Sequence, residues 1–414
     1  MSDPERGRSL RVLVVEDDPA TAQVLFDVLS GFGHSVRVVH DGAASLPELL
    51  RDPPELLVVD LMMPGLDGVE VCQQARATPS LAGLKIIVLS GKIYEADRLA
   101  ALAAGADAFL TKPVRLALLG ETIAQVMAGG ATVRFWGVRG TLPAPARSNV
   151  RYGGNTSCVS LHLPHDRFIV FDAGTGIRVC GAHLLAEGAG RLTGTVLITH
   201  PHWDHINALP FFGPLYLPGN QVEICGPAQG RMGMKELVAA QMDGRFFPIT
   251  PREFGADVHY RDLRPGSCQV QGVEVECILL MHPGTCLGYR VRHEGRSLAY
   301  ITDQELISDD QPWSSADQRQ RLLTALQGVD LLIADCTYTD AEYPQRVGWG
   351  HSSVGATVDL AHEAGVGTLA LFHHDPSQTD DDIDAKLAFA RARLLALGSS
   401  TQVIAPAEGD VRPL

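Results

Sequence analysis

The chain has 414 residues, of which 45% are hydrophobic and 20% charged, an ordinary balance for a globular protein of two or three domains. The formal net charge is −14 and no run of Lys or Arg is present, which argues against a large nucleic acid as partner. The eight cysteines form no Cys-x-x-Cys pair, so neither a disulfide framework nor a zinc knuckle is predicted. No apolar run is long enough to span a bilayer, and we therefore expect a cytoplasmic protein with no membrane partner.

Short apolar runs alternate with amphipathic stretches in the first 127 residues. The runs occupy residues 12–15, 36–39, 56–59, 86–89 and 108–110. Strands that alternate with helices predict an α/β fold, here a doubly wound, five-stranded parallel sheet. Functional residues of such a sheet belong at the carboxyl ends of its strands.

Polar side chains stand at four of these strand ends: Glu16 and Asp17, then Asp60, Ser90 and Lys112. The acids can hold a magnesium ion through oxygen ligands. Asp60 could then attack a phosphoryl donor, while the metal and Lys112 offset the charge of the transferred group. The alternative is that the acids only cap helices, a role open to Asp17 and Asp18. Polar residues at four strand ends favour a binding site.

This part of the chain resembles the response-regulator receiver domain, and every position of that family's pattern is filled. The resemblance implies a role for each residue: Asp60 as phosphoacceptor, Glu16 and Asp17 with Asp60 as magnesium ligands, Ser90 as switch hydroxyl, and Lys112 as the family's lysine. The implied partner is a sensor histidine kinase or a phosphotransfer protein.

Two further expectations follow from the receiver resemblance. Phe109 falls at the family's aromatic switch position, although a plain place in the core is equally open to it. The peptide between Lys112 and Pro113 should be cis, a geometry that only proline makes readily accessible.

The pair Gly129-Gly130 predicts a helix stop and a short hinge. We therefore expect a receiver domain over residues 1–127, a linker over 128–131 and a second domain over 132–414. Residues 133–140 predict a strand that ends in a turn, and the glycines of 152–158 and 172–176 predict tight turns under a pocket floor. Arg139 could clamp a phosphate or form a surface ion pair.

The segment Thr199-His200-Pro201-His202-Trp203-Asp204-His205 follows an apolar strand over residues 194–198. In extended backbone, His200 and His202 project to the same side. Asp204 and His205 can turn to an adjacent point as the chain enters a helix near Ile206. Two pairs of nitrogen and oxygen ligands side by side suit two divalent ions in one pocket, although a polar loop with chance histidines would share this composition.

Three more candidate ligands each follow an apolar strand. His282 comes after residues 273–281, Asp303 after 298–302, and His373 after 368–372. Any of them alone is more often a hydrogen-bonded or capping side chain than a ligand. His374 competes with His373, but strand alternation aims it the other way.

His-x-His-x-Asp-His after a strand is similar to the signature of the metallo-β-lactamase superfamily, and the resemblance extends from about Thr132 to the C-terminus. The blocks Phe-Trp-Gly-Val-Arg-Gly and Tyr-Gly-Gly-Asn-Thr-Ser-Cys resemble phosphodiesterase-like members, akin to ribonuclease Z and metal-dependent cyclic-nucleotide phosphodiesterases. The implied fold is an αββα sandwich with two divalent ions, zinc or alternatively manganese. The implied ligands are His200, His202 and His282 for one ion, Asp204, His205 and His373 for the other, and Asp303 as a bridge. Asp204 is thereby also a member of the catalytic set.

Gly350-His351-Ser352-Ser353 opens a helix predicted over residues 354–364. The block resembles the His-Ser-Thr block of ribonuclease Z-like enzymes, which implies that His351 assists departure of the leaving oxygen. Asp335, at the end of a strand over residues 330–334, stands where that family has an acidic partner. Such a pair fixes the ring tautomer and supports proton donation. The alternative is an exposed histidine near a helix N-cap.

We predict a response regulator whose output is a dinuclear metal-dependent hydrolase, in particular a phosphodiesterase controlled by phosphorylation of Asp60. Redox members of the fold usually carry an acid at the second motif position, so His202 favours hydrolysis. Residues 210–264 predict loops and short helices without a long arm for gripping transfer RNA, which favours a small or cyclic nucleotide substrate. Two alternatives remain, a hydrolase of a lactone or thioester and a catalytically idle interaction protein, and a homodimer is left open.

Overall fold

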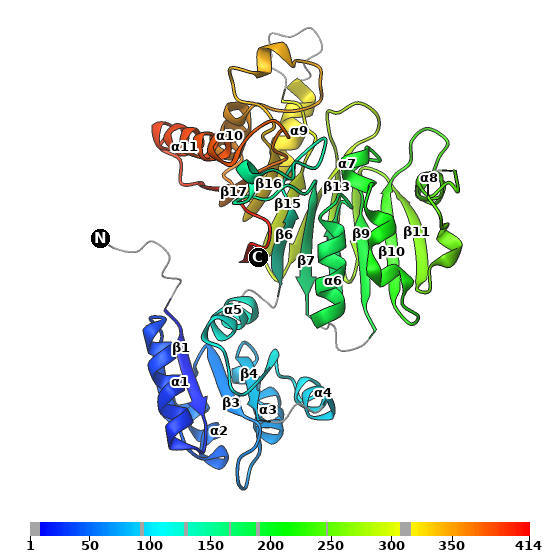
Figure 1. Cartoon of the computed structure of the whole chain (residues 1–414). Helices are drawn as coiled ribbons and strands as arrows, with labels where there is room; N and C mark the ends of the chain where they lie inside the picture. The colour runs from blue at the N-terminus through cyan, green and yellow to red at the C-terminus, as the bar shows by residue number, and fades with distance from the viewer. Residues whose placement is uncertain are drawn as a thin grey trace. The chain divides into compact units, whose positions relative to one another are not determined.

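The computed structural model describes residues 9–91, 95–127, 131–164, 167–187, 191–245, 247–306 and 316–414. The chain divides between residues 130 and 131 into two compact units (Figure 1). The predicted hinge Gly129-Gly130 lies outside the described residues. None of the described helices is long and apolar enough to cross a bilayer.

The first unit is a parallel five-stranded sheet in the order β2-β1-β3-β4-β5, as the alternating pattern predicted. Its strands are β1 (Arg11–Val15), β2 (Ser35–Val39), β3 (Leu56–Asp60), β4 (Lys85–Ser90) and β5 (Ala108–Thr111). Its helices are α1 (Pro19–Gly31), α2 (Gly42–Arg51), α3 (Gly68–Arg76), α4 (Glu95–Ala103) and α5 (Leu116–Met127), with a short 3₁₀ turn η1 (Pro79–Leu81).

Both faces of this sheet are buried, because helices cover both. In β1, Val12 and Val14 belong to the core on one face, while Leu13 and Val15 belong to the core on the other. Successive side chains of a strand point to opposite faces, so a strand covered on both sides has to be apolar at every position. This requirement explains the unbroken apolar runs of the sequence.

The start of the first helix assigns different roles to Asp17 and Asp18, which follow the first strand. Asp18 is the N-cap of α1, and its carboxylate accepts a hydrogen bond of 2.9 Å from the backbone N–H of Thr21. Asp17 is therefore not needed as a cap and stays available at the sheet edge. The Lys112–Pro113 peptide is cis, as expected.

The second unit contains two seven-stranded sheets. The first has the order β11-β10-β9-β8-β7-β6-β19, and its strands are β6 (Thr132–Gly137), β7 (Cys158–Leu163), β8 (Arg167–Phe171), β9 (Thr193–Leu197), β10 (Gln221–Pro227), β11 (Asp257–Leu263) and β19 (Val411–Pro413). The second sheet has the order β12-β13-β14-β15-β16-β17-β18. Its strands are β12 (Gly266–Val270), β13 (Val273–Leu279), β14 (Leu287–His293), β15 (Arg296–Ile301), β16 (Leu331–Asp335), β17 (Thr368–Phe372) and β18 (Gln402–Ile404).

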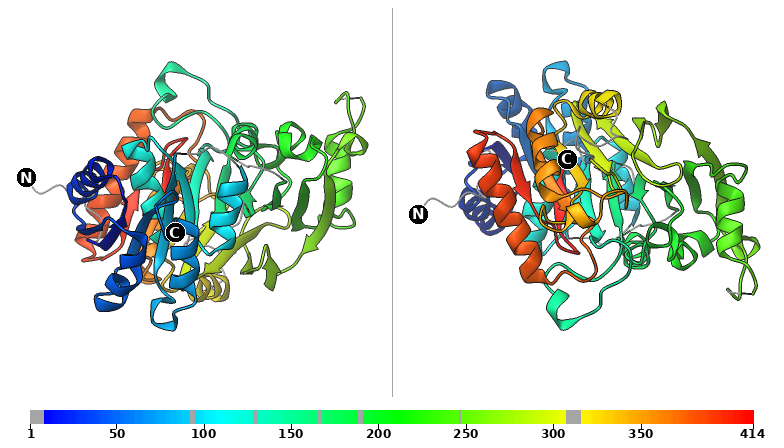
Figure 2. Two further views of the ribbon diagram at one scale, coloured as in Figure 1. Left: turned by 90° about the horizontal axis from the view of Figure 1, so that it is seen from below. Right: turned by 90° about the horizontal axis from the view of Figure 1, so that it is seen from above.

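Helices cover the outer faces of the two sheets, which gives four layers. They are α6 (Ile177–Glu187), α7 (Trp203–Ile206), α8 (Met234–Gln241), α9 (Ala316–Leu326), α10 (Val354–Glu363) and α11 (Asp380–Ala396), with the 3₁₀ turns η2 (Arg147–Asn149), η3 (Leu209–Phe211), η4 (Gly213–Tyr216), η5 (Pro251–Glu253) and η6 (Tyr343–Gln345). One core lies between the sheets, one lies under α6 and α8, and one lies under α9, α10 and α11. Figures 1 and 2 show α10 and α11 side by side against the second sheet.

Two details differ from the sequence-based expectations. Residues 210–264 contain β10 and β11, and not only loops and short helices. The β11 strand lies at the sheet edge and is polar at alternate positions, so it lacks the apolar run that would have revealed it. The helix expected near Ile206 begins at Trp203, with His202 as its N-cap, so Asp204 and His205 lie within this single turn.

Arg139 is neither a phosphate clamp nor a surface residue. Its side chain is fully buried and donates hydrogen bonds to the carbonyl oxygens of Gly153 and Gln378, and its guanidinium lies 3.5 Å from Asp380. A buried guanidinium needs such partners because an unpaired charge in the interior is costly. Arg139 therefore holds the glycine-rich loop before β7 against the start of α11.

Candidate metal centre and receiver site

The predicted receiver residues meet at the carboxyl edge of the first unit's sheet. The Lys112 ammonium lies 2.6 Å from a carboxylate oxygen of Glu16 and 3.0 Å from one of Asp60. Carboxylate oxygens of Glu16, Asp17 and Asp60 lie close enough together to share a cation. Burial raises the pKa of Glu16; burial would lower the pKa of Lys112, but hydrogen bonds to the two acids raise it.

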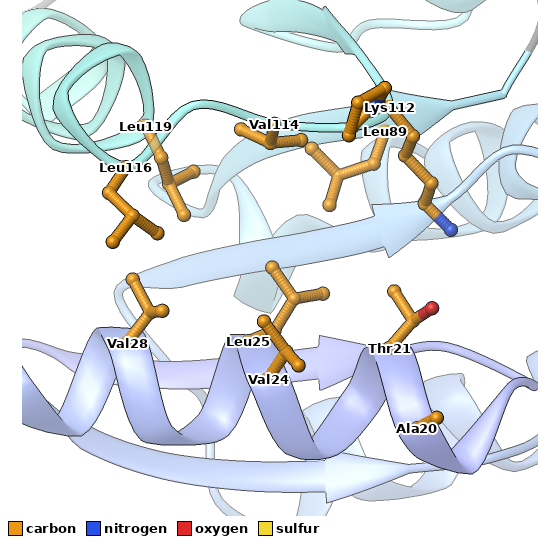
Figure 3. A pocket seen from close by; sticks show the side chains of 11 residues that line it. Ala20, Thr21, Val24, Leu25, Val28, Leu89, Lys112, Val114, Leu116 and Leu119 are labelled. Carbon is orange, nitrogen blue, oxygen red and sulfur yellow. The ribbon is translucent and has the colours of Figure 1, made fainter.

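Ser90 is the last residue of β4, and Phe109 lies within the neighbouring strand β5. Ser90 is fully buried, and its carbonyl oxygen accepts a 2.7 Å hydrogen bond from the backbone N–H of Lys112. Phe109 is half-buried and packs against the core of the unit. Next to this edge, a cavity of about 550 Å³ runs between α1 and the segment after β5, with Lys112 at one end and Val28 and Leu116 towards the other (Figure 3).

In the second unit, the first group of predicted ligands faces a common point. The ring nitrogen Nδ1 of His202 lies 2.9 Å from Nε2 of His200 and 3.1 Å from Nε2 of His282. One Asp303 oxygen lies 3.5 Å from Nε2 of His200 and 3.6 Å from Nε2 of His282. These four atoms belong to side chains from both sheets.

The second group lies on the other side of Asp303. Nε2 of His205 is 3.2 Å from Asp204 and 3.1 Å from the second oxygen of Asp303. Nε2 of His373 is 3.2 Å from the same Asp204 oxygen and 3.0 Å from the same Asp303 oxygen. The structure thus brings all seven predicted ligands together in two groups that share Asp303.

The geometry of both groups fits divalent cations. Ligand atoms around a tetrahedral ion bound at about 2.0–2.1 Å lie roughly 3.3 Å apart, which is close to the separations seen here. His205 Nε2 is buried without a hydrogen-bond partner among the described residues, although two carboxylate oxygens lie within 3.2 Å of it. Such an atom is aimed at a shared point, as a metal ligand would be. These two clusters together form a candidate site for divalent metal ions.

The backbone is strained where it delivers these side chains. Asp303 and His373 have φ values of 54° and 58°, in the left-handed region that non-glycine residues seldom adopt. Both follow the end of a strand, and the reversed backbone turns their side chains into the centre. Such strain occurs at functional sites where the surrounding structure holds it. At Gly140 a Cβ atom would lie 2.1 Å from the His373 ring, so only glycine fits there.

Asp172 supports the centre without being one of the predicted ligands. It is fully buried with φ 58°, and one carboxylate oxygen lies 2.7 Å from Nδ1 of His205. The same carboxylate accepts hydrogen bonds from the backbone N–H of Thr199 at 2.7 Å and from the Tyr300 hydroxyl at 3.0 Å. The first contact fixes the proton of His205 on Nδ1, which leaves Nε2 for a metal. The glycines around Asp172 indicated only a tight turn, although Asp172 follows an apolar strand as several predicted ligands do.

The charges of the cluster stabilise one another. Burial would raise the pKa of Asp204 and of Asp303, but the neighbouring imidazoles hold the pKa of both carboxyl groups below the ordinary range. Burial would lower the pKa of His205, but Asp204, Asp303 and Asp172 raise it. Burial lowers the pKa of His200, so its ring is kept neutral, as a ligand requires.

His351 and Asp335 form a pair beside the metal ligands. His351 Nδ1 lies 2.7 Å from a carboxylate oxygen of Asp335. The His351 ring stacks on His373 at a centroid distance of 4.9 Å and lies 5.2 Å from His282. Burial would lower the pKa of His351, but the adjacent Asp335 raises it to about 9. Asp303, Asp335, His351 and His373 also lie close enough together to form a third possible ligand group.

Glu305 fixes the loop that carries His351, and nothing in the sequence indicated this role. Its buried carboxylate accepts hydrogen bonds from the backbone N–H groups of Gly348 at 2.7 Å and Gly350 at 2.8 Å. It also accepts one from the Tyr343 hydroxyl at 2.9 Å. The carbonyl oxygen of Gly350 in turn lies 2.9 Å from Nδ1 of His282. One loop therefore orients both a predicted ligand and the predicted proton donor.

His374 lies outside both ligand groups. It is fully buried, its Nδ1 lies 3.8 Å from the Cys336 sulfur, and its ring packs near Tyr152. Burial and the nearby Lys386 lower its pKa. The two adjacent histidines thus point in opposite directions, as strand alternation predicted.

Comparison with known families identifies both units. The family model of the response regulator receiver domain matches residues 12–124, and the model of the beta-lactamase superfamily domain matches residues 167–374. The second match covers half of the chain, and this protein belongs to the beta-lactamase superfamily, with a response regulator receiver domain as its first unit. Both resemblances drawn from the sequence, and the α/β fold class, are confirmed.

Curated relatives of this chain include response regulators. Response regulator MprA of Mycobacterium bovis is 42% identical over 135 residues, which is 31% of this chain and 58% of MprA. The relative of the same name in Mycobacterium avium is 46% identical over 107 residues, 26% of this chain and 46% of that protein. The chain therefore spans about half the length of these relatives.

Solved structures also align with the second unit. The metallo-beta-lactamase fold protein YhfI from Bacillus subtilis is 18% identical with a TM-score of 0.48, covering 68% of this chain and 98% of YhfI. A diphosphatase of the PhnP family is 18% identical with a TM-score of 0.47, covering 68% of this chain and 96% of that protein.

The support given by Asp172 can be tested by Asp172→Asn, which keeps the shape of the side chain and removes its charge. His205 would lose its anionic acceptor, and we expect metal affinity to fall about 10- to 100-fold. Competition with a chelator measures this affinity. Asp330→Asn is a matched control, because Asp330 also accepts a backbone hydrogen bond, from Ser297, but lies outside the clusters. Equal metal affinity in the Asp172 variant and the native protein would contradict the assignment.

Proposed function

We propose that this protein is a response regulator whose output domain is a dinuclear metal-dependent phosphodiesterase. The substrate class is a small or cyclic nucleotide phosphodiester, and phosphorylation of Asp60 by a sensor histidine kinase or a phosphotransfer protein controls the activity. The observation that carries this proposal is the His351–Asp335 pair. The His351 ring packs beside the predicted ligands His282 and His373. A proton donor in that place suits a reaction that releases an alkoxide.

The seven side chains described above would hold two divalent ions, zinc or alternatively manganese. His200, His202 and His282 form the first set, Asp204, His205 and His373 form the second, and Asp303 belongs to both. Two ions so placed would supply an activated water at neutral pH and would offset negative charge on the phosphoryl oxygens. Glu16, Asp17 and Asp60 would hold a magnesium ion in the receiver domain.

His351 can hold and deliver a proton. Its contact with Asp335 places one proton on Nδ1 and leaves Nε2 to donate another. A pKa of about 9 keeps the ring protonated at neutral pH, when a leaving oxygen would need the proton. Glu305 holds the loop of His351 in place, so the donor is oriented before substrate arrives.

Hydrolysis of another bond is the second candidate. A thioester releases a thiolate that needs little protonation, so its hydrolysis would make no use of the His351–Asp335 pair. A lactone releases an alkoxide, so the pair does not argue against a lactone substrate.

A catalytically idle domain has less support. Strained backbone at Asp303 and His373 and a complete set of ligands would be costly to keep without a function.

Metal analysis tests the assignment of Asp303. Asp303→Ala should lose more than one equivalent of metal per chain, because this carboxylate serves both ions, and elemental analysis measures the loss. Asp330→Ala is the matched control and should retain its metal, since Asp330 lies outside all the ligand groups. Full occupancy in the Asp303 variant would mean that the bridge is wrongly placed.

Substrates with different leaving groups test His351. His351→Ala should slow the hydrolysis of a nucleotide phosphodiester by about 10²- to 10⁴-fold, the usual contribution of a general acid. Hydrolysis of an activated nitrophenyl ester should fall far less, because nitrophenolate leaves as a stable anion. Steady-state kinetics on both substrates, with metal content measured in parallel, give the result.

Two outcomes would change the assignment of His351. An equal loss on both substrates with full metal content would make it a residue that positions substrate. A loss of metal would place it in the third ligand group described above.

Control by the receiver domain is tested with a small phosphodonor. Acetyl phosphate with magnesium should change the phosphodiesterase rate of the native protein, while Asp60→Asn, which lacks the phosphoacceptor, should not respond. The comparison of rates with and without donor in both proteins is the measurement. An unchanged rate in a native protein shown to be phosphorylated would remove regulation from the proposal.

A further inference from the structure

The metal centre has one side open to solvent. Five of the seven predicted ligands are buried and the side chain of His282 is only 3% exposed, whereas His202 is exposed and the side chain of His351 is 12% exposed. The rings of these three histidines form a row, with centroid distances of 5.0 Å between His202 and His282 and 5.2 Å between His282 and His351. Solvent therefore reaches the centre at His202 and, to a smaller extent, at His351.

An exposed tryptophan lies next to each end of this histidine row in the sequence. Trp203 directly follows His202 and is 80% exposed. Trp349 precedes His351 by two residues and is 57% exposed. Tryptophan carries one of the largest apolar surfaces of any side chain, and exposure of that surface leaves it available for a flat ligand.

The second tryptophan is held in place before any ligand arrives. The guanidinium of Arg346 lies 4.7 Å from the centre of the Trp349 ring, within the range of a cation–π contact. Glu305 fixes the neighbouring backbone through Gly348 and Gly350. A ring on a fixed loop loses little conformational freedom on binding, which favours recognition.

The first tryptophan is fixed by the metal motif itself. Trp203 is the first residue of the single turn α7, and the next two residues, Asp204 and His205, are buried ligands. The backbone of Trp203 therefore cannot move without moving the centre. Neither tryptophan belongs to a core cluster, so a packing role does not account for them.

We infer that Trp203 and Trp349 each stack on one base of a dinucleotide whose phosphodiester lies over the row of His202, His282 and His351. The inference rests on the proposed phosphodiesterase function and narrows its substrate class to a phosphodiester with a base on each side. Stacking of a base on an aromatic side chain tolerates any base, because every base has a π-face. Recognition of this kind fits an acidic protein whose sequence contains no run of Lys or Arg.

Equilibrium binding to the metal-loaded full chain tests the inference without turnover. The probes are a phosphorothioate-linked adenosine dinucleotide, which resists hydrolysis, and ribose 5-phosphate, which has a phosphate but no base. Trp203→Ala and Trp349→Ala should each weaken binding of the dinucleotide by roughly 5- to 150-fold, the measured worth of stacking one base. Ribose 5-phosphate should bind equally to all variants, and Trp203→Phe should restore most of the affinity for the dinucleotide.

Leu395→Ala is the control for loss of an exposed apolar side chain, because Leu395 is 82% exposed on α11. This substitution should leave binding of the dinucleotide unchanged. The inference is overturned if either tryptophan variant binds the dinucleotide as the native protein does, or if the native protein binds it no better than ribose 5-phosphate. If the protein binds the dinucleotide through its bases but hydrolyses no phosphodiester, the stacking role of the two tryptophans is supported and the proposed phosphodiesterase function is wrong. If the protein hydrolyses a dinucleotide and neither tryptophan variant changes the rate, the proposed function is supported and the stacking role is wrong.

Discussion

The buried carboxylate of Asp172 is the contact on which the second unit's functional edge depends. It joins the end of β8 to Thr199 after β9, to His205 in α7 and to Tyr300 in β15. Tyr300 belongs to the other sheet, so one charged group fixes the relative position of both sheets at this edge. An uncompensated carboxylate in the interior would be costly, and the several donors around Asp172 remove that cost. The same bonds aim His205 at the site of the metal.

The receiver unit was predictable because its signals are local. Glu16, Asp60, Ser90 and Lys112 each follow an apolar run of three or four residues, and a parallel sheet brings the ends of such runs to one edge. The motif from His200 to His205 was predictable for the same reason, since its spacing alone places four side chains together. For His282, Asp303 and His373, the order along the chain had to be combined with a family resemblance. Nothing in their spacing shows that His282 and His373 will each lie within 3.6 Å of Asp303.

The remaining errors come from interactions that sequence does not encode locally. Arg139 became a buried residue because Gly153, Gln378 and Asp380 surround it, and two of these lie more than two hundred residues away. Glu305 looks like any acid after a strand, and only the folded loop shows that it accepts three hydrogen bonds. The β11 strand was missed because an edge strand needs few apolar residues. In each case the deciding contact is a long-range one.

The division of the ligands between two sheets has a thermodynamic consequence. Four ligands come from the loop and turn after β9, while His282, Asp303 and His373 come from strands of the other sheet. A bound ion would therefore act as a cross-link between the sheets, in addition to any part in catalysis. Ions that bind only the folded chain add about 2.7 kcal/mol to its stability for each site at a free concentration one hundred times the dissociation constant. Persistence of the folded domain in a cell would thus depend on the supply of metal as well as on temperature.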